Sequence, residues 1–168
     1  LTDNGSFQFN GSGTFPERRD ELGNETDGHE FRGHIYARGN SGLTEHWSYG
    51  FDVNRATDDT YIRRYRFGNQ DTLTSRAYTE RIEKRDYVGV QGLAFQGLRE
   101  EDDPDRSPVV LPSVDVHVES DPLWKGARAS FTANALAISR QIGEETRRVA
   151  MEGNIHLPLI SRSGQVIE

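Results

Sequence analysis

Polar and apolar residues alternate along most of this chain. In the segment FRGHIYARG, Phe31, Ile35 and Ala37 occupy odd positions, whereas His34 and Arg38 occupy even ones. A period of two puts successive side chains on opposite faces of an extended strand, so the pattern predicts β-strands. We predict an all-β fold with about eight long strands, at residues 5–15, 29–39, 44–56, 72–83, 87–98, 108–119, 124–139 and 147–160.

The alanine-rich run at 127–137 is the segment for which a helix competes, because alanine has the highest helix propensity. However, Ser130, Thr132 and Asn134 occupy alternate positions rather than one helical face. The flanking segments also carry strand patterns. We therefore assign the run to the seventh strand.

The connections between these strands alternate in length. The long ones are 16–28, 57–71 and 99–107, the short ones are 40–43, 84–86, 120–124 and 161–164, and 140–146 is intermediate. In an antiparallel up-and-down meander, long and short connections then lie at opposite ends of the sheet. Bacterial outer-membrane barrels have this asymmetry. The spacing favours a segment of a large transmembrane β-barrel over a soluble sheet, whose buried and solvated faces would give the same alternation.

Composition and charge limit the partners that the chain can have, and its two ends indicate how much of a barrel it contains. The mean hydropathy of -0.77 fits barrel strands, in which only alternate residues are apolar. The net charge of -7 argues against nucleic acid as a partner, and the absence of cysteine excludes a disulfide within these residues. The opening LTDNGSFQFN has no signal-peptide pattern, and the closing SGQVIE resembles the start of a strand. We expect residues 1–168 to be a partial outer-membrane barrel domain, cut at both ends.

The polar positions of the strands carry many charged side chains. Such charge is costly to pack in a small closed core, so we predict that the polar face lines a hydrated lumen and that the apolar face contacts lipid. The residues predicted to face the lumen are Arg32, His34, Asp52, Asn134, Arg148 and Glu152. Trp47, Tyr49 and Trp124 lie at or near short turns, which is typical of an aromatic girdle at the periplasmic interface.

The chain carries no enzyme or metal-site signature. Asp102, Asp103 and Asp105 form an acidic run, but their spacing does not match a calcium loop, and a solvated loop is the simpler interpretation. The histidines lack metal-ligand spacing, and no nucleophile elbow is present. We expect no catalytic residues, no metal and no cofactor.

Three blocks in order resemble the lipopolysaccharide-assembly outer-membrane protein family, LptD, also called OstA or organic solvent tolerance protein. The blocks are GFDVNRATDDTYIRRYRFG, then AFQGLREEDDP with PVVLPSVDVHVESDP, then ETRRVAMEGNIHLPLIS. The alphaproteobacterial branch is most similar. The resemblance extends over nearly the whole chain, and its specificity comes from all the blocks being in register. It implies a section from the middle of a very large barrel that inserts lipopolysaccharide into the outer leaflet of the Gram-negative cell outer membrane.

The resemblance also implies partners. These are lipopolysaccharide, an LptE-type lipoprotein that plugs the barrel, and periplasmic lipopolysaccharide bridge proteins, which act through an N-terminal domain that this section lacks. Three alternatives remain from the residue pattern. A porin-like outer-membrane barrel shares every argument from patterning. A soluble all-β carbohydrate-binding module would alternate in the same way, and a barrel enzyme of the phospholipase type would need a serine–histidine pair that does not stand out here.

The segment TYIRRYRF lies in the long connection 57–71, which we place at the extracellular rim with its aromatic rings at the headgroup level. Guanidinium groups bind phosphate bidentately, and the outer leaflet presents phosphorylated lipid A. Arg63, Arg64 and Arg66 are therefore candidate lipopolysaccharide contacts. The alternative is that they pair with Asp58 and Asp59, because exposed ion pairs form readily.

The alternation of loop lengths predicts the sidedness of the protein. On intact cells, a membrane-impermeant thiol reagent should label cysteines introduced in 16–28, 57–71 and 99–107. It should spare cysteines in 40–43, 84–86 and 161–164. Labelling of the short turns from outside would contradict this topology.

Overall fold

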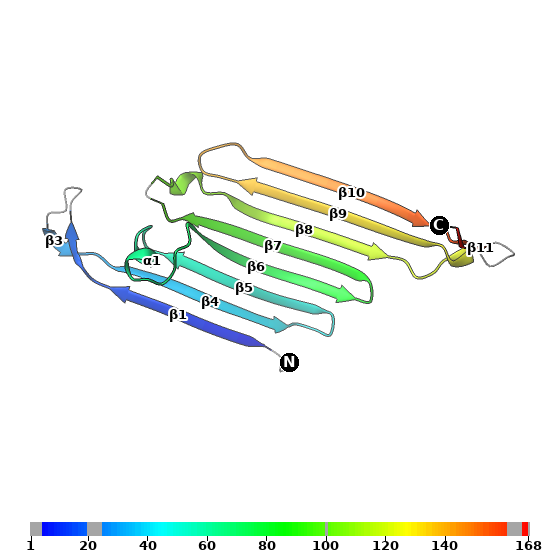
Figure 1. Cartoon of the computed structure of the whole chain (residues 1–168), viewed down its shortest axis with the longest axis horizontal. Coiled ribbons are helices and arrows are strands. Elements are labelled where there is room, and N and C mark those ends of the chain that lie inside the picture. The colour runs from blue at the N-terminus through cyan, green and yellow to red at the C-terminus, as the bar shows by residue number, and fades with distance from the viewer. Residues whose placement is uncertain (1–4, 20–24, 100, 161–165, 168) are drawn as a thin grey trace.

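The computed structural model describes residues 5–19, 25–99, 101–160 and 166–167, and one antiparallel sheet dominates it (Figure 1). Its strands are β1 (Ser6–Thr14), β4 (Arg32–Gly42), β5 (Trp47–Ala56), β6 (Thr72–Glu83), β7 (Asp86–Gly97), β8 (Val109–Glu119), β9 (Arg128–Ser139) and β10 (Thr146–His156). They follow one another in chain order across the sheet. The predicted all-β up-and-down meander of eight long strands is confirmed, and the alanine-rich run is strand β9.

The long connections contain short strands and helical turns, which the alternation of polar and apolar residues does not reveal. Strands β2 (Glu17–Arg19) and β3 (Glu25–His29) pair in the first long connection. Helix α1 (Tyr61–Arg64) lies between β5 and β6, and a turn of 3₁₀ helix, η1 (Pro104–Arg106), lies between β7 and β8. No helix among the described residues is long and apolar enough to cross a membrane.

Four predicted strand boundaries are wrong at the short-turn end. The turn predicted at 40–43 lies at 43–46, because β4 continues to Gly42 and β5 begins at Trp47, whose carbonyl accepts the amide of Leu43 at 2.8 Å. The other two boundaries are the start of β9 and the end of β10.

The strand predicted at 124–139 begins only at Arg128, because residues 124–126 form the 3₁₀ turn η2 (Trp124–Gly126). Gly126 has a φ of 79°, which a strand cannot accommodate, and the amide of Leu123 bonds the carbonyl of Ala127 at 2.7 Å to close the turn.

The strand predicted at 147–160 ends at His156. Pro158 follows, and proline cannot donate a ladder hydrogen bond. Beyond it, β11 (Leu159–Ile160) pairs with β12 (Val166–Ile167) in a separate two-stranded sheet. The short turn predicted at 161–164 lies outside the described residues.

The strand register separates a polar face from an apolar face. Residues directly opposite each other share a face, and Arg38 lies opposite Asp52, while Asn134 lies opposite Asp115. On the other face, Ala133 lies opposite Val116. The register places all six residues predicted to face the lumen on the polar face: Arg32, His34, Asp52, Asn134, Arg148 and Glu152.

Large side chains on both faces lie over glycines of neighbouring strands. A Cβ atom at Gly50 would lie 2.5 Å from Tyr78 on the polar face, and one at Gly39 would lie 2.9 Å from Phe51 on the apolar face. The Phe7 and Phe51 rings are 5.9 Å apart, with Gly39 between them in the sheet. These contacts hold adjacent strands together, and no second sheet of the described residues packs on this one.

The apolar core of the described residues is small and lies at one end of the sheet. It consists of Tyr61, Ile62, Leu73 and Leu98, each at most 3% exposed. Among these residues the middle of the sheet has no such cluster. The apolar face is open, with Met151 of the edge strand β10 71% exposed. Among the described residues, β1 and β10 each pair along one side only, so the sheet is open at both edges.

The register predicts that the same substitution costs very different amounts of folding free energy at two adjacent positions of β9. Ala133 lies between Val116 and Met151 on the apolar face, so in a lipid-facing wall Ala133→Arg should cost ~2–4 kcal/mol of folding free energy. Thr132→Arg should cost much less, because Thr132 lies between His117 and Glu152 on the polar face. A folding titration in lipid vesicles measures both, and equal losses would contradict the face assignment.

Candidate functional site at the long-loop end

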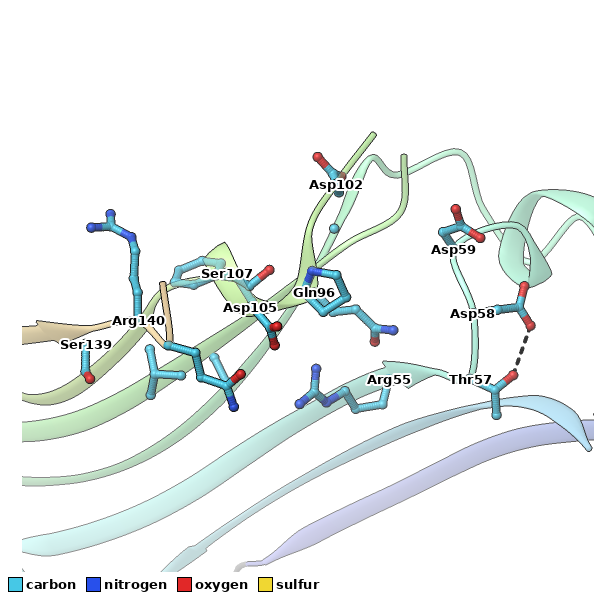
Figure 2. A pocket seen from close by; sticks show the side chains of 16 residues that line it. Arg55, Thr57, Asp58, Asp59, Gln96, Asp102, Asp105, Ser107, Ser139 and Arg140 are labelled. Atoms are coloured by element: carbon cyan, nitrogen blue, oxygen red, sulfur yellow. Dashed lines mark hydrogen bonds between the residues drawn. The ribbon is translucent and has the colours of Figure 1, made fainter. Parts of the chain in front are cut away.

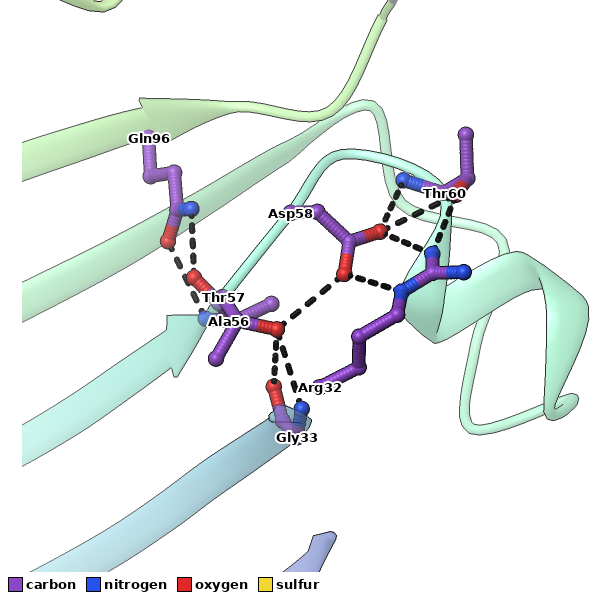
Figure 3. A network of polar contacts seen from close by, with 7 residues as sticks. All are labelled: Arg32, Gly33, Ala56, Thr57, Asp58, Thr60 and Gln96. Carbon is purple, nitrogen blue, oxygen red and sulfur yellow. Dashed lines mark hydrogen bonds and ion pairs between the residues drawn. The ribbon is translucent and has the colours of Figure 1, made fainter. Parts of the chain in front are cut away.

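The ladder between β5 and β6 stops before the long-loop end of the sheet. Residues 47–52 pair with 76–81, and beyond them side chains bond the backbone of β5. The hydroxyl of Ser75 accepts a hydrogen bond from the amide of Asn54 at 3.0 Å and donates to its carbonyl at 3.1 Å. The amide group of Gln96 accepts from the nitrogen of Ala56 at 3.1 Å and donates to its oxygen at 2.8 Å (Figure 3). We call this opening, between residues 53–56 and 72–75, the wedge.

The connection 57–71, here called the rim loop, contributes half of the core at this end of the sheet. Tyr61 and Ile62 of α1 are 2% and 0% exposed and cluster with Leu73 and Leu98. Their burial fixes a helix of only four residues, which would not be stable alone. The core therefore joins the rim loop to the ends of β6 and β7.

The helix ends in a Schellman motif built on an arginine. The amide of Phe67 bonds the carbonyl of Ile62 at 2.9 Å, and the amide of Arg66 bonds that of Arg63 at 3.2 Å. Arg66 has a φ of 60°, the left-handed conformation that glycine usually supplies. The motif turns Phe67 back, so that its ring centroid lies 4.1 Å from that of His34.

A chain of polar contacts attaches the rim loop to the polar face. The hydroxyl of Tyr61 lies 2.8 Å from the hydroxyl of Ser12, which lies 2.8 Å from Nδ1 of His34. Nε2 of His34 lies 3.1 Å from the side-chain oxygen of Asn10. His34 is only 6% exposed, so the rim loop covers the polar face above β1 and β4.

An ion pair holds the start of the rim loop to β4. Nε of Arg32 donates to Oδ2 of Asp58 at 2.8 Å, and a second guanidinium nitrogen contacts Oδ1 (Figure 3). Thr60 donates its amide and its hydroxyl to Asp58, and the Thr57 hydroxyl donates to it at 3.1 Å. Burial opposes ionisation of Asp58, but these hydrogen bonds outweigh it and lower its pKa to about 2.

A second ion-pair group holds the end of the rim loop. Asp71 pairs with Arg99, at 2.7 Å, and with Arg63. The hydrogen bond from Arg99, supported by the charge of Arg63, lowers the pKa of Asp71 below its ordinary value. Arg99 directly follows Leu98, so this group joins the rim loop to the connection after β7.

The structure corrects the predicted pairing of the rim arginines. Asp58 pairs with Arg32, and Arg63 pairs with Asp71, so the predicted network of Arg63, Arg64 and Arg66 with Asp58 and Asp59 is wrong for Arg63 and Asp58. Arg64 and Arg66 are exposed and form no ion pair with another described residue.

The predicted place of the aromatic rings is also wrong for Tyr61. Its ring is buried against the polar face, where its hydroxyl contacts Ser12 and its ring centroid lies 5.8 Å from that of His34. Tyr65 and Phe67 are 41% and 40% exposed. The candidate contacts Arg64 and Arg66 therefore sit on a loop that is folded over the sheet rather than extended away from it.

The acidic run in the connection after β7 stabilises its own loop. The carboxylate of Asp103 accepts the amide of Asp105 at 3.0 Å, and that of Asp102 accepts the amide of Arg99 at 3.0 Å. Within the described part of the chain, no group of three or more His, Cys, Asp or Glu side chains is arranged to hold a metal ion.

Sequence reasoning missed several residues on which this end of the sheet depends. The side chains of Ser75 and Gln96 form hydrogen bonds with backbone groups of β5, and no local sequence pattern predicts such bonds. The adjacent apolar pair Tyr61 and Ile62, inside a polar connection, is the one signal that points to a buried turn.

The family model for LptD, described as LPS transport system D, matches residues 30–168. The chain belongs to the LptD family. The match starts just before β4 and runs through β10, with β1 outside it, and the resemblance seen in the three sequence blocks is confirmed. LptD proteins are transport proteins of the Gram-negative outer membrane and act in lipopolysaccharide assembly. A search of curated proteins finds no match to the chain.

The Asp58 network predicts how the rim loop responds to acid. The folded pKa of about 2 lies below the unfolded value of about 4, so the carboxylate stabilises the loop above pH ~4 and loses this effect as the pH falls towards 2. Asp58→Asn should remove about 1–2 kcal/mol from the opening free energy of the loop at pH 6. Amide hydrogen exchange of residues 57–71 measures it. If Asp58→Asn and Asp59→Asn loosen the loop equally, the assignment is refuted.

Proposed function

We propose that residues 1–168 are a partial barrel domain that forms a section of the wall of a lipopolysaccharide translocon. The observation that carries this proposal is the exposed apolar face. Phe9, Val149, Met151 and Ile155 are 64%, 67%, 71% and 82% exposed, which a soluble protein would not leave in water. The unpaired edges of β1 and β10 support it further, because a closed barrel would pair both with further strands.

In this proposal the two faces of the sheet contact different environments. The apolar face contacts the lipid of the outer membrane. The polar face lines the lumen, where Arg148 and Glu152 are exposed and Asp52 and Asn134 are half-buried. The rim loop covers Arg32 and His34. Ion pairs such as Arg38–Asp52, at 2.6 Å, reduce the cost of charge on the lumen wall.

The proposal includes the partners of the complete translocon. The polar face would contact an LptE-type plug lipoprotein in the lumen, and periplasmic bridge proteins would deliver lipopolysaccharide through a domain outside this section. The wall needs no catalytic residue, because it holds and guides the lipid rather than changing its covalent structure. The rim loop narrows the outer mouth of the lumen where it covers β1 and β4.

Within this function, we assign the exposed arginines of the rim loop a contact with lipopolysaccharide phosphates. Arg64 and Arg66 support this role, because they are exposed and form no ion pair with another described residue. Arg63 would contribute after exchanging its pairing with Asp71 for one with phosphate. Arginine suits this exchange because its guanidinium group binds carboxylate and phosphate in the same bidentate geometry.

Replacement of Arg63, Arg64 and Arg66 by glutamine tests this contact. In cells that carry the full-length protein, photo-crosslinking of lipopolysaccharide at the rim loop should fall and sensitivity to large hydrophobic antibiotics should rise. Barrel assembly and plug binding should remain intact. Asp71→Asn is the matched control, since it frees Arg63 without removing a cation. Unchanged crosslinking in assembled protein would leave these residues a structural role only.

A further inference from the structure

A pocket of about 610 Å³ lies at the long-loop end of the sheet, apart from the rim-loop arginines. Its walls come from three connections: residues 57–59 of the rim loop, the connection after β7, and the start of the connection after β9. Figure 2 shows Arg55 extending from the end of β5 into the space between Asp59 and Asp105, with Ser139 and Arg140 on the far side.

The register places the floor of this pocket on the apolar face. Arg55 lies opposite Ile35, which shares its face with Ala37. In the neighbouring strands, Ala94 lies opposite Val109, which lies opposite Ser139, and Ala94 alternates in β7 with Gly92 and Val90 of the apolar face. The pocket therefore opens on the face opposite to the one that the rim loop covers.

The pocket contains both hydrogen-bond donors and hydrogen-bond acceptors. Arg55 and Arg140 supply cationic donors, and Asp59 and Asp105 supply acceptors. Within the described part of the chain, Arg55 forms no ion pair, and Gln96 is already engaged with Ala56. The carboxylates of Asp59 and Asp105 would repel a phosphate group. A saccharide hydroxyl both donates and accepts, so donors and acceptors in one pocket match a saccharide.

The position of Arg55 indicates that the ligand also has acyl chains. A cation in an apolar row is costly within the hydrocarbon, but at the end of a strand its long side chain reaches the headgroup layer. The exposed apolar row continues from the pocket floor, with Val109 41% exposed, and offers a surface to acyl chains.

We propose that this pocket binds the saccharide headgroup of a glycolipid in the outer leaflet, whose acyl chains lie along the adjacent apolar face. The inference rests on the proposed function, because it requires the apolar face to contact lipid. It places a glycolipid site on the outside of the wall, whereas Arg63, Arg64 and Arg66 belong to the loop over the polar face. Lipopolysaccharide is the glycolipid that the family's function supplies.

Photo-crosslinking in two kinds of vesicle tests the proposal. The full-length protein carries a photoreactive residue at Ser139 and is reconstituted with lipopolysaccharide or with phosphatidylglycerol, an anionic lipid without a sugar chain. Ser139 should capture lipopolysaccharide and not phosphatidylglycerol. Arg55→Gln and Asp105→Asn should each lower the capture about tenfold, as expected for loss of one charge-assisted hydrogen bond. Arg106→Gln, an exposed arginine outside the pocket, should have no effect.

A second photoreactive position separates failure of the pocket from failure of the proposed function. Ala133 lies at mid-depth on the apolar face and should capture either lipid in every variant, which also shows that the variants are assembled. No capture at Ala133 would overturn the proposed function. Capture at Ala133 together with equal capture of both lipids at Ser139, or with Arg55→Gln matching Arg106→Gln, would overturn the saccharide pocket alone.

Discussion

The end of the ladder between β5 and β6 is the constraint on which the rim of this sheet depends. A strand end in lipid or in a protein interior needs hydrogen-bond partners for its backbone groups. Beyond Asp52, β6 no longer pairs with β5. The Ser75 hydroxyl of β6 bonds the backbone of Asn54 instead, and the Gln96 side chain of β7 bonds the backbone of Ala56. The rim loop then packs Tyr61 and Ile62 against Leu73 and Leu98 at this end. The wedge, the core and the pairing of Arg32 with Asp58 are thus parts of one arrangement.

Most of the fold could be predicted from the sequence, because one rule governs it. A strand whose two faces contact different environments must alternate, and FRGHIYARG and ARASFTAN do so. Two of the boundaries that failed lie where one residue overrides the pattern. The positive φ of Gly126 delays the start of β9, and Pro158 lies just beyond the end of β10. Neither residue disturbs the alternation that the prediction relied on.

The site was less predictable, because its bonds join residues far apart in the chain. The face of Arg32, His34 and Asp52 followed from alternation. The pairing of Arg32 with Asp58 did not, since Asp58 lies in a connection whose path no pattern specifies. The Schellman motif was hidden for another reason: its left-handed position carries Arg66, where a glycine would have marked the end of a helix.

The bonds between Gln96 and Ala56 also constrain the order in which this sheet can assemble. Apart from them, each long strand depends on its immediate neighbours, so hairpins can be added one after another. The end of β5 is different, because its last backbone groups are satisfied from β7, two strands further along the sheet. The last backbone groups of β5 therefore gain these side-chain partners only when β7 is in place, so the outer end of β5 is completed by a strand that is not its neighbour.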